Sequence, residues 1–385
     1  MLHFEQLRSD IGALGEHAVE QQRQQRAACE AALERLASAP PGAELLDRWP
    51  DAQEECALPA TEAPLGRCFT AQGPPPPETT VTAVDGSQIM PDRHSPVLYY
   101  LIQVGGLIFR YNGTAPTPCR EATLHYTEAE LYDDRGQIIG RQLGMRRTVA
   151  EMTYLARLTG QARAEGASAL QFALIDGPLL WPYKGHSEEE QQVLLPAYMA
   201  ALDRLRENEA LPAGFVERPG GRPLLNTLAL LPAETGDEPL PPRLLVHMSD
   251  RVLMETHLAP GARTAWLKRP SRMNRYHAQR GHEIVFCYMN LGLEGYPVIA
   301  RVEVPAWAIS REEKSAALHT VLLHQARVLH GYPYALARAH EVALVTQEDK
   351  AALDHLLQRR LMEAGLPPAR PSEKARQKAY LGRRR

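Results

Sequence analysis

Residues 80–94 read TVTAVDGSQIMPDRH, a β-prone run that leads into a carboxylate and a glycine. The stretch from Thr80 to Val84 predicts a buried strand, and Gly86 permits a tight exit from it. Asp85 is therefore expected where a buried strand opens to solvent, a position typical of metal-binding carboxylates. Because Asp-Gly also ends many ordinary strands, this stretch alone does not distinguish a site from a turn.

A second strand sequence ends in the same way. The apolar run from Leu170 to Ile175 leads into Asp176 and Gly177. A parallel or mixed sheet brings equivalent strand ends side by side, so Asp85 and Asp176 are expected to lie close together.

Between the two aspartates, the sequence predicts a hairpin, a strand and a helix. Residues 97–104 and 107–111 are strongly β-type, and Gly105-Gly106 between them is a hairpin signal. A third strand is expected near 122–131, and a helix over 141–165. Later elements are expected as a helix at 188–207, strands at 213–219, 284–289 and 298–304, and helices at 311–330 and around 335–341.

Composition favours a soluble, globular, cytoplasmic protein. The chain has 385 residues, 44% of them hydrophobic, which is enough for a large core. No apolar run approaches the roughly 20 residues that span a bilayer. The five cysteines are odd in number and not closely paired, which argues against a disulfide framework and a thiolate zinc site.

The chain is expected to have three parts. Residues 1–72 form a helical arm and linker, with one long helix over 4–37 whose polar middle projects or pairs with another helix. The proline run at 74–77 marks a boundary before a second domain at 79–350. Residues 351–385 hold a C-terminal helix and a basic tail, which either holds phosphates or is a solvated end.

One internal segment mixes basic and aromatic residues. Over residues 263–282, this pattern suits a phosphate-lined channel with stacking positions, although a merely positive surface loop has the same composition. The candidate DNA contacts are Arg263, Lys268, Arg269, Arg272, Arg275 and Arg280.

Seven short motifs, in order, resemble those of the NurA nuclease family. They cover about residues 79–350. The motifs are Asp85-Gly86-Ser87-Gln88 with 91–94, 99–102, Ile175-Asp176-Gly177-Pro178-Leu179, 214–219, Ser249-Asp250-Arg251, 300–305 and 331–340.

The resemblance implies a ribonuclease H-like α/β fold: a mixed sheet flanked by helices, here with the N-terminal helical arm. It implies a manganese-dependent DNA nuclease, possible also with Mg²⁺, that cuts single strands and DNA ends as an endonuclease and 5′–3′ exonuclease. The family works as a homodimer, here through strands or the arm, docked on a HerA-type hexameric ATPase in end resection and break repair.

Carried over by motif, Asp85, Asp176 and His340 match the family's metal ligands, and Tyr332 matches its tyrosine. Glu151, on the helix at 141–165, is the choice for the remaining acid; Glu128, Glu130, Asp133 and Asp134 are alternatives. Carboxylates and an imidazole suit Mn²⁺, and paired divalent ions supply both a hydroxide and charge neutralisation for phosphodiester hydrolysis.

Two other interpretations stay open. A non-catalytic adaptor that guides DNA into the ATPase would not need both aspartates, the histidine and the tyrosine. A nuclease of an anti-phage defence system would use the same residues for a different purpose. The Gly-rich pairs 105–106 and 220–221 lack the Lys-Ser/Thr of a phosphate loop, so any motor activity must come from a partner.

Overall fold

The computed structural model describes residues 4–40, 44–45, 54–92, 95, 97–133, 136–137, 140–166, 170–182, 189–231 and 248–366. The basic tail after 366, the proline- and acid-rich sequence at 234–242, and the residues Arg93, His94 and Asp134 lie outside this set. The chain forms two compact units. The first unit comprises Met1–Pro77, Leu174–Tyr183 and Leu211–Tyr334; the second comprises Glu78–Ala173, Lys184–Ala210 and Ala335–Arg385.

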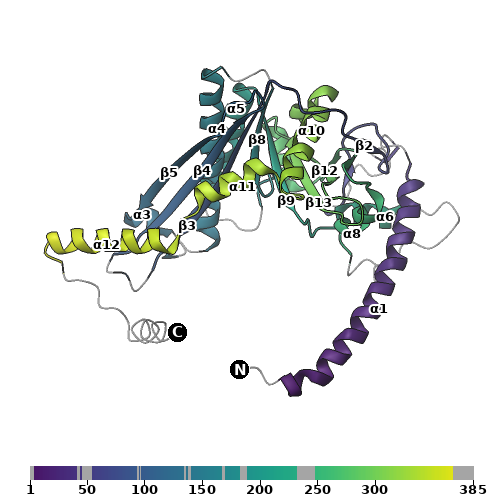
Figure 1. The fold of residues 1–385 in the computed structure, drawn as a ribbon, viewed down its shortest axis with the longest axis horizontal. Helices are drawn as coiled ribbons and strands as arrows, with labels where there is room; N and C mark the ends of the chain where they lie inside the picture. Colours follow the sequence, from purple (N-terminus) through teal and green to yellow (C-terminus); the bar gives the residue numbers. More distant parts are fainter. Residues whose placement is uncertain are drawn as a thin grey trace. The chain divides into compact units, whose positions relative to one another are not determined.

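The expected fold class is confirmed: a mixed sheet of eleven strands is flanked by helices, with a long helix at the N-terminus (Figure 1). The strands are β1 Leu58–Pro59, β2 Cys68–Thr70, β3 Thr79–Ile89, β4 Tyr100–Arg110, β5 Thr117–His125, β8 Leu170–Asp176, β9 Ala210–Glu217, β10 Ala262–Thr264, β11 Leu267–Lys268, β12 Ile284–Asn290 and β13 Ile299–Pro305. A separate ribbon pairs β6 Tyr132–Asp133 with β7 Gly136–Gln137.

The described helices have the following bounds: α1 Phe4–Ala37, α3 Glu128–Leu131, α4 Arg141–Ala164, α5 Leu195–Glu207, α6 Pro223–Leu230, α8 Asp250–His257, α9 Arg272–Gln279, α10 Glu312–Val328, α11 Tyr334–Ala343 and α12 Gln347–Glu363. A π-helical turn at Glu190–Leu194 leads into α5, and a 3₁₀ turn at Ala306–Ile309 follows β13. None of these helices combines the length and apolar character needed to cross a bilayer.

In the second unit, β4 pairs antiparallel with both β3 and β5. The predicted hairpin at Gly105-Gly106 is wrong, because β4 runs straight through both glycines. A Cβ on Gly105 would lie 2.3 Å from the backbone nitrogen of Ala343 in α11, and one on Gly106 would lie 2.5 Å from the Leu158 side chain in α4. The glycines are therefore present because helices press on the strand, not because the chain turns.

These contacts place α11 and α4 on opposite faces of the same strands. Successive residues of a strand point to opposite faces, and Gly105 and Gly106 are adjacent. Gly105 meets α11 and Gly106 meets α4. Figure 1 shows α4 beside α5, with which it packs in the second unit.

The strand that carries Asp85 is longer than the sequence suggested. β3 continues to Ile89, and Asp85 pairs with Gly105 in the interior of the ladder. The predicted strand end at Asp85 is thus wrong. By contrast, β8 ends at Asp176 as predicted, and Gly177 turns the chain with φ of 103°. The third strand was placed too late: β5 spans Thr117–His125, and residues 128–131 form α3 instead.

The first unit contains α1 and a core beneath it. The predicted helix over 4–37 is confirmed. Its second half buries Ala28, Ala32 and Leu36 in a cluster with side chains of α6 and α8, whereas its first half leaves Phe4 and Ile11 exposed. In this unit β12 pairs antiparallel with β13, and β13 with β9. All five cysteines are free, as expected.

Candidate functional site

Two of the predicted site residues meet in the second unit. Nδ1 of His340, on α11, lies 2.6 Å from Oδ2 of Asp85, on β3. The other carboxylate oxygen of Asp85 accepts a hydrogen bond from its neighbour Gly86 N at 2.8 Å. The Asp85 side chain is 17% exposed and that of His340 is 64% exposed. The carboxylate is held from two sides, and most of the imidazole surface is exposed.

Helix α11 is positioned by backbone and polar contacts close to this pair. The carbonyl of Ala343 accepts hydrogen bonds from the Ser87 hydroxyl and from Nε2 of Gln103, the latter at 2.9 Å. Gly105 lets the same helix turn approach the strand, as described above. The motif around Asp85 thus supplies both the candidate ligand carboxylate and, two residues later, the hydroxyl that anchors α11.

Glu151 reaches the same strand from the other side. A Cβ on Gly86 would lie 2.5 Å from Oε1 of Glu151 and 2.9 Å from Cγ of Arg147, so the missing side chain makes room for both. Glu151 is buried and pairs with Nε of Arg147 at 3.0 Å on α4. Because Asp85 and Gly86 are consecutive, Glu151 approaches the face of β3 opposite to the one that carries Asp85 and His340.

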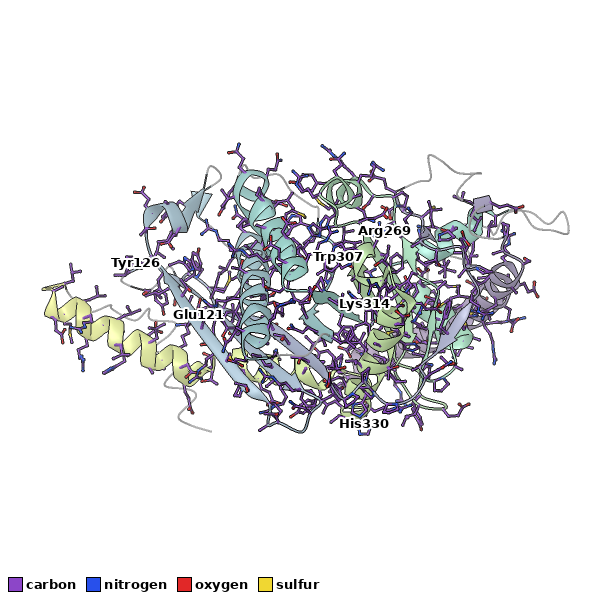
Figure 2. All side chains as sticks on the ribbon, turned by 90° about the horizontal axis from the view of Figure 1, so that it is seen from above. Glu121, Tyr126, Arg269, Trp307, Lys314 and His330 are labelled. Carbon is purple, nitrogen blue, oxygen red and sulfur yellow. The ribbon has the colours of Figure 1, made fainter. Side chains whose placement is uncertain are left out.

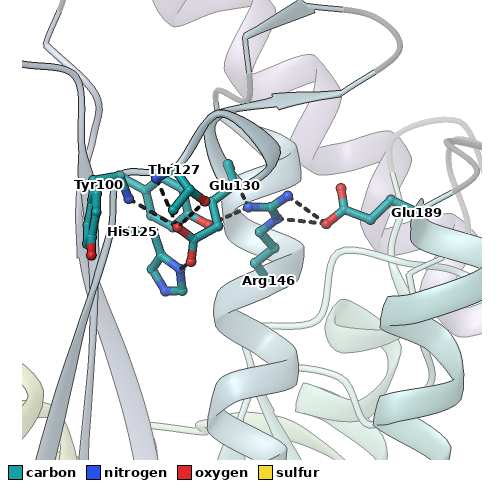
Figure 3. Close-up of polar contacts among 7 residues, drawn as sticks. Tyr100, His125, Thr127, Glu130, Arg146 and Glu189 are labelled. Atoms are coloured by element: carbon teal, nitrogen blue, oxygen red, sulfur yellow. Dashed lines mark hydrogen bonds and ion pairs between the residues drawn. The ribbon is translucent and has the colours of Figure 1, made fainter.

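Of the alternative acids, Glu130 is committed to a different task (Figure 3). Its carboxylate accepts the Thr127 hydroxyl at 2.7 Å in a capping box for α3 and contacts Nδ1 of His125 at 2.8 Å. These bonds, with that from Thr127 the strongest, lower the pKa of Glu130 to about 2. The side chain of Asp133 lies outside the described residues.

Glu130 belongs to a network centred on Arg146 (Figure 3). Arg146 pairs with Glu189 at 2.7 Å, donates to the Glu130 carbonyl at 2.6 Å and bonds the Tyr100 hydroxyl. The Tyr100 ring stacks on His125 with centroids 4.5 Å apart. These groups border a cavity of about 490 Å³ between α4 and strands β4 and β5. Since they bond mainly to one another, the network ties together α3, α4 and Glu189, the residue before the π-helical turn that leads into α5.

Asp176 lies in the first unit, at the start of a turn that several groups hold in place. Gly177 N donates to the Phe215 carbonyl at 2.8 Å. The backbone nitrogens of Leu179 and Leu180 both donate to Oε2 of Glu303, at 2.9 and 3.0 Å. A Cβ on Gly214 would collide with this turn, 2.6 Å from Leu179 N. The chain after Asp176 is therefore fixed by β9 and β13.

Glu303 is part of a buried ionic network that sequence reasoning did not assign. Glu303 is 5% exposed and pairs with Arg301 at 2.8 Å. Asp250, fully buried, accepts from Leu224 N, Leu225 N and the Tyr288 hydroxyl. Burial raises the pKa of Asp250 to about 6, opposed by those bonds. The acid in the Ser249-Asp250-Arg251 motif and the one in the 300–305 motif thus satisfy distant backbone groups.

Tyr332 also lies in the first unit. Its ring packs edge-on against Phe215, with centroids 5.5 Å apart. Phe215 also accepts the hydrogen bond from Gly177 described above. Tyr332 and the turn after Asp176 therefore share one neighbour. The five predicted catalytic residues form two groups, Asp85, Glu151 and His340 in the second unit and Asp176 and Tyr332 in the first.

The basic segment at 263–280 is largely engaged within the first unit. Arg263 is 5% exposed and donates to the Thr264 carbonyl and the Ser315 hydroxyl, which leaves it serving the fold rather than a ligand. Arg275 pairs with Glu54 at 2.9 Å. The remaining members are arranged as follows: Lys268 pairs with Glu283, Arg269 with Glu55, the Arg272 backbone nitrogen bonds Glu54, and Arg280 lies over the Tyr276 ring.

Among the described residues, no three His, Cys, Asp or Glu side chains converge as a preformed metal cage. The Asp85 and His340 pair is nevertheless a partial donor set of suitable chemistry, since Mg²⁺-type sites often use one or two carboxylates and complete their shell with water and substrate phosphate.

Comparisons with known proteins give one family. The model of the NurA domain matches residues 79–345. A search of curated proteins finds no match. A solved structure described as the crystal structure of NurA is 14% identical, with a TM-score of 0.43, and the match covers 75% of this chain and 90% of that one. A second, of NurA with manganese, is 12% identical with a TM-score of 0.46, covering 94% and 100%. A crystal structure of Drosophila Piwi is 9% identical with a TM-score of 0.29, covering 68% and 29%.

Proposed function

Because this chain belongs to the NurA family, we propose that it is a metal-dependent DNA nuclease, in which Asp85 and His340 form the centre of the metal site. The contact between these two side chains, 2.6 Å apart, is the observation that carries the proposal. It joins two positions 255 residues apart in the sequence, both of which the family motifs mark.

The expected cofactor is Mn²⁺, with Mg²⁺ as the alternative. The ion would be held by Asp85 and His340. The family pattern also expects Glu151 and Asp176 as ligands, although Glu151 approaches the opposite face of β3 and Asp176 belongs to the first unit. When bound, such ions generate a hydroxide nucleophile and neutralise charge on the phosphorus.

The protein's own residues prepare the site. Asp85 accepts from Gly86 N, which fixes the orientation of its carboxylate. When Nδ1 of His340 carries the proton, its bond to Asp85 leaves Nε2 as the lone-pair nitrogen, available to a metal ion. Tyr332 would place the scissile phosphate through its hydroxyl.

The biological setting is also a proposal. The activity is expected on single strands and DNA ends, as an endonuclease and 5′–3′ exonuclease. It would serve end resection and break repair in a homodimer with a HerA-type hexameric ATPase.

The decisive experiment is Asp85→Ala, assayed for Mn²⁺-stimulated cleavage of single-stranded DNA. We expect cleavage to be lost while the circular dichroism spectrum and melting temperature are kept. Cleavage at the wild-type rate would remove Asp85 from the metal site. If the wild type itself cuts at no manganese concentration but stimulates the partner ATPase, the protein is an adaptor instead.

A matched pair of variants tests the acid on the helix. Glu151→Gln should abolish cleavage, whereas Glu128→Gln on α3 removes a charge of the same kind and should leave the rate near wild type. The reverse result would move the assignment from Glu151 to Glu128.

A further inference from the structure

A polar cleft in the first unit brings together parts of three of the family motifs, and Tyr332 is the one described lining residue that also has a role in the catalytic assignment. Its volume is about 750 Å³. The lining includes Glu217 and Arg218 at the end of β9, Ser249 and Arg251 at the start of α8, and His330 with Tyr332 before α11. These segments lie far apart in the sequence. Apart from His330, which directly precedes the 331–340 motif, the residues named belong to the motifs noted above. Figure 2 shows His330 at the molecular surface.

Two of the residues that line this cleft have a strained backbone conformation. Arg218 and His330 have φ of 49° and 53°, in the left-handed region that residues with a Cβ seldom adopt. Gly331, next to His330, has φ of 121°, and a Cβ there would lie 2.8 Å from Val298. Such conformations are energetically unfavourable and cluster at ligand-binding sites.

The cleft presents hydrogen-bond donors that the fold does not use up. The Arg218 side chain is 81% exposed, and its ion-pair partner among the described residues is Glu217, at 3.9 Å. Arg251 uses Nη1 to bond Glu255 on its own helix, and a guanidinium has five N–H donors in all. The Ser249 side chain does not cap α8.

We propose that this cleft binds the phosphodiester backbone of the DNA strand, with Arg218 and Arg251 as its phosphate contacts. Arginine forks match phosphate oxygens in pairs, and the Ser249 hydroxyl and Tyr332 supply further polar contacts. Glu217 and Glu255 keep the net charge of the cleft small, so each arginine acts through direct contact rather than through a broad positive field. The identity of the ligand rests on the proposed nuclease function.

The test measures binding without cleavage. The full chain is titrated with a fluorescein-labelled single-stranded oligonucleotide in EDTA, by anisotropy, at several salt concentrations. Arg218→Ala and Arg251→Ala should each weaken binding several-fold at low salt and reduce the slope of log K against log salt by about 1. Arg218→Lys, which keeps the charge, should retain most of that slope.

A control variant removes a charge of the same kind elsewhere. Arg311 lies at the N-terminal end of α10. The length of this helix, about 25 Å, separates Arg311 from the cleft residues that follow α10. Arg311→Ala should bind as the wild type does. Equal loss in Arg311→Ala would reduce the effect to net charge and overturn the proposal, as would unchanged affinity and slope in both cleft variants.

A competition experiment tests whether the ligand of the cleft is a DNA strand or a single nucleotide. Thymidine monophosphate should compete with the oligonucleotide only at concentrations far above the oligonucleotide's own dissociation constant. Competition at equal concentration would assign the cleft to a nucleotide and overturn the proposal. Since the assay contains no metal, its outcome is independent of the Asp85→Ala experiment, and either idea can fail without the other.

Discussion

Nδ1 of His340 lies 2.6 Å from Oδ2 of Asp85. Helix α11, which carries the histidine, packs against Gly105 of β4, the residue paired with Asp85 in the sheet. A carboxylate that accepts a hydrogen bond from one imidazole nitrogen fixes the orientation and the tautomer of the ring. This pair therefore behaves as one unit in the chemistry proposed above.

Two substitutions of His340 should distinguish the role of Nδ1 from that of Nε2. His340→Asn can still donate to Asp85 through its amide but has no counterpart of Nε2, whereas His340→Ala loses both contacts. If Nε2 binds metal or transfers a proton, both variants should lose at least about 10- to 100-fold in cleavage or manganese affinity. A manganese titration of the cleavage rate measures this. Near-normal activity in the Asn variant would show that His340 only orients Asp85.

Gly86 provides a test of Glu151 that leaves the acid in place. In Gly86→Ala, the new methyl would meet the carboxylate end of the Glu151 side chain and the middle of the Arg147 side chain, at Cγ and Cδ, so both would have to shift. We expect a small change in melting temperature but a marked loss of cleavage, because Glu151 is displaced. Gly144→Ala, on α4 with open space around it, should keep activity and stabilise the helix by up to about 1 kcal/mol. Full activity in Gly86→Ala would mean that the approach of Glu151 is not needed.

The two glycines inside β4 should differ in tolerance. Gly105→Ala would place Cβ 2.3 Å from backbone nitrogen of α11, which cannot rotate away, whereas Gly106→Ala meets the tip of Leu158. Overpacking costs typically about 1–3 kcal/mol, and we expect Gly105→Ala at or above the upper end and Gly106→Ala below it. Denaturant unfolding of both variants measures the difference. Equal losses would contradict the distinction between backbone and side-chain contact.

Asp250 should give the stability a recognisable pH dependence. Burial raises its pKa to about 6 in the folded state from 3.8, so between these values the folded chain binds more protons than the unfolded chain. Its contribution therefore favours folding at low pH and is lost as pH rises through about 4 to 6, by at most about 1.4 kcal/mol per pH unit. Asp250→Asn should remove this slope.

The measurement is the melting temperature of wild type and Asp250→Asn from pH 4 to 7. Because other groups titrate in both proteins, the difference between the two curves is the quantity that reports on Asp250. A constant difference across this window would mean that Asp250 titrates outside it.

Sequence reasoning found the elements whose signals are local. The apolar run ending at Asp176 and the helix over 141–164 are encoded by their own residues, and both are confirmed. It misread Gly105-Gly106 because a glycine pair signals a turn unless distant helices press on the strand, and Ala343 is more than 230 residues away. Asp85 was placed at a strand end for the same reason, since Gly86 serves Glu151 and not a turn.

The candidate site shows the same division. The chemistry of Asp85 and His340 could be predicted from residue types in a familiar order, but their contact depends on how α11 is seated. The role of Glu303 in holding Leu179 and Leu180 could not be predicted, because its sequence is that of an ordinary buried strand.

Helix α11 packs directly against the main chain of β4 at Gly105, and this contact limits how far His340 can move relative to Asp85. Where two elements meet through side chains, a change of rotamer or a core substitution can alter their spacing by an ångström or more. Here main chain meets main chain, and the spacing is set by bond lengths and atomic radii. Substitutions elsewhere in the core of the second unit should therefore lower the melting temperature more readily than they shift the position of the His340 imidazole.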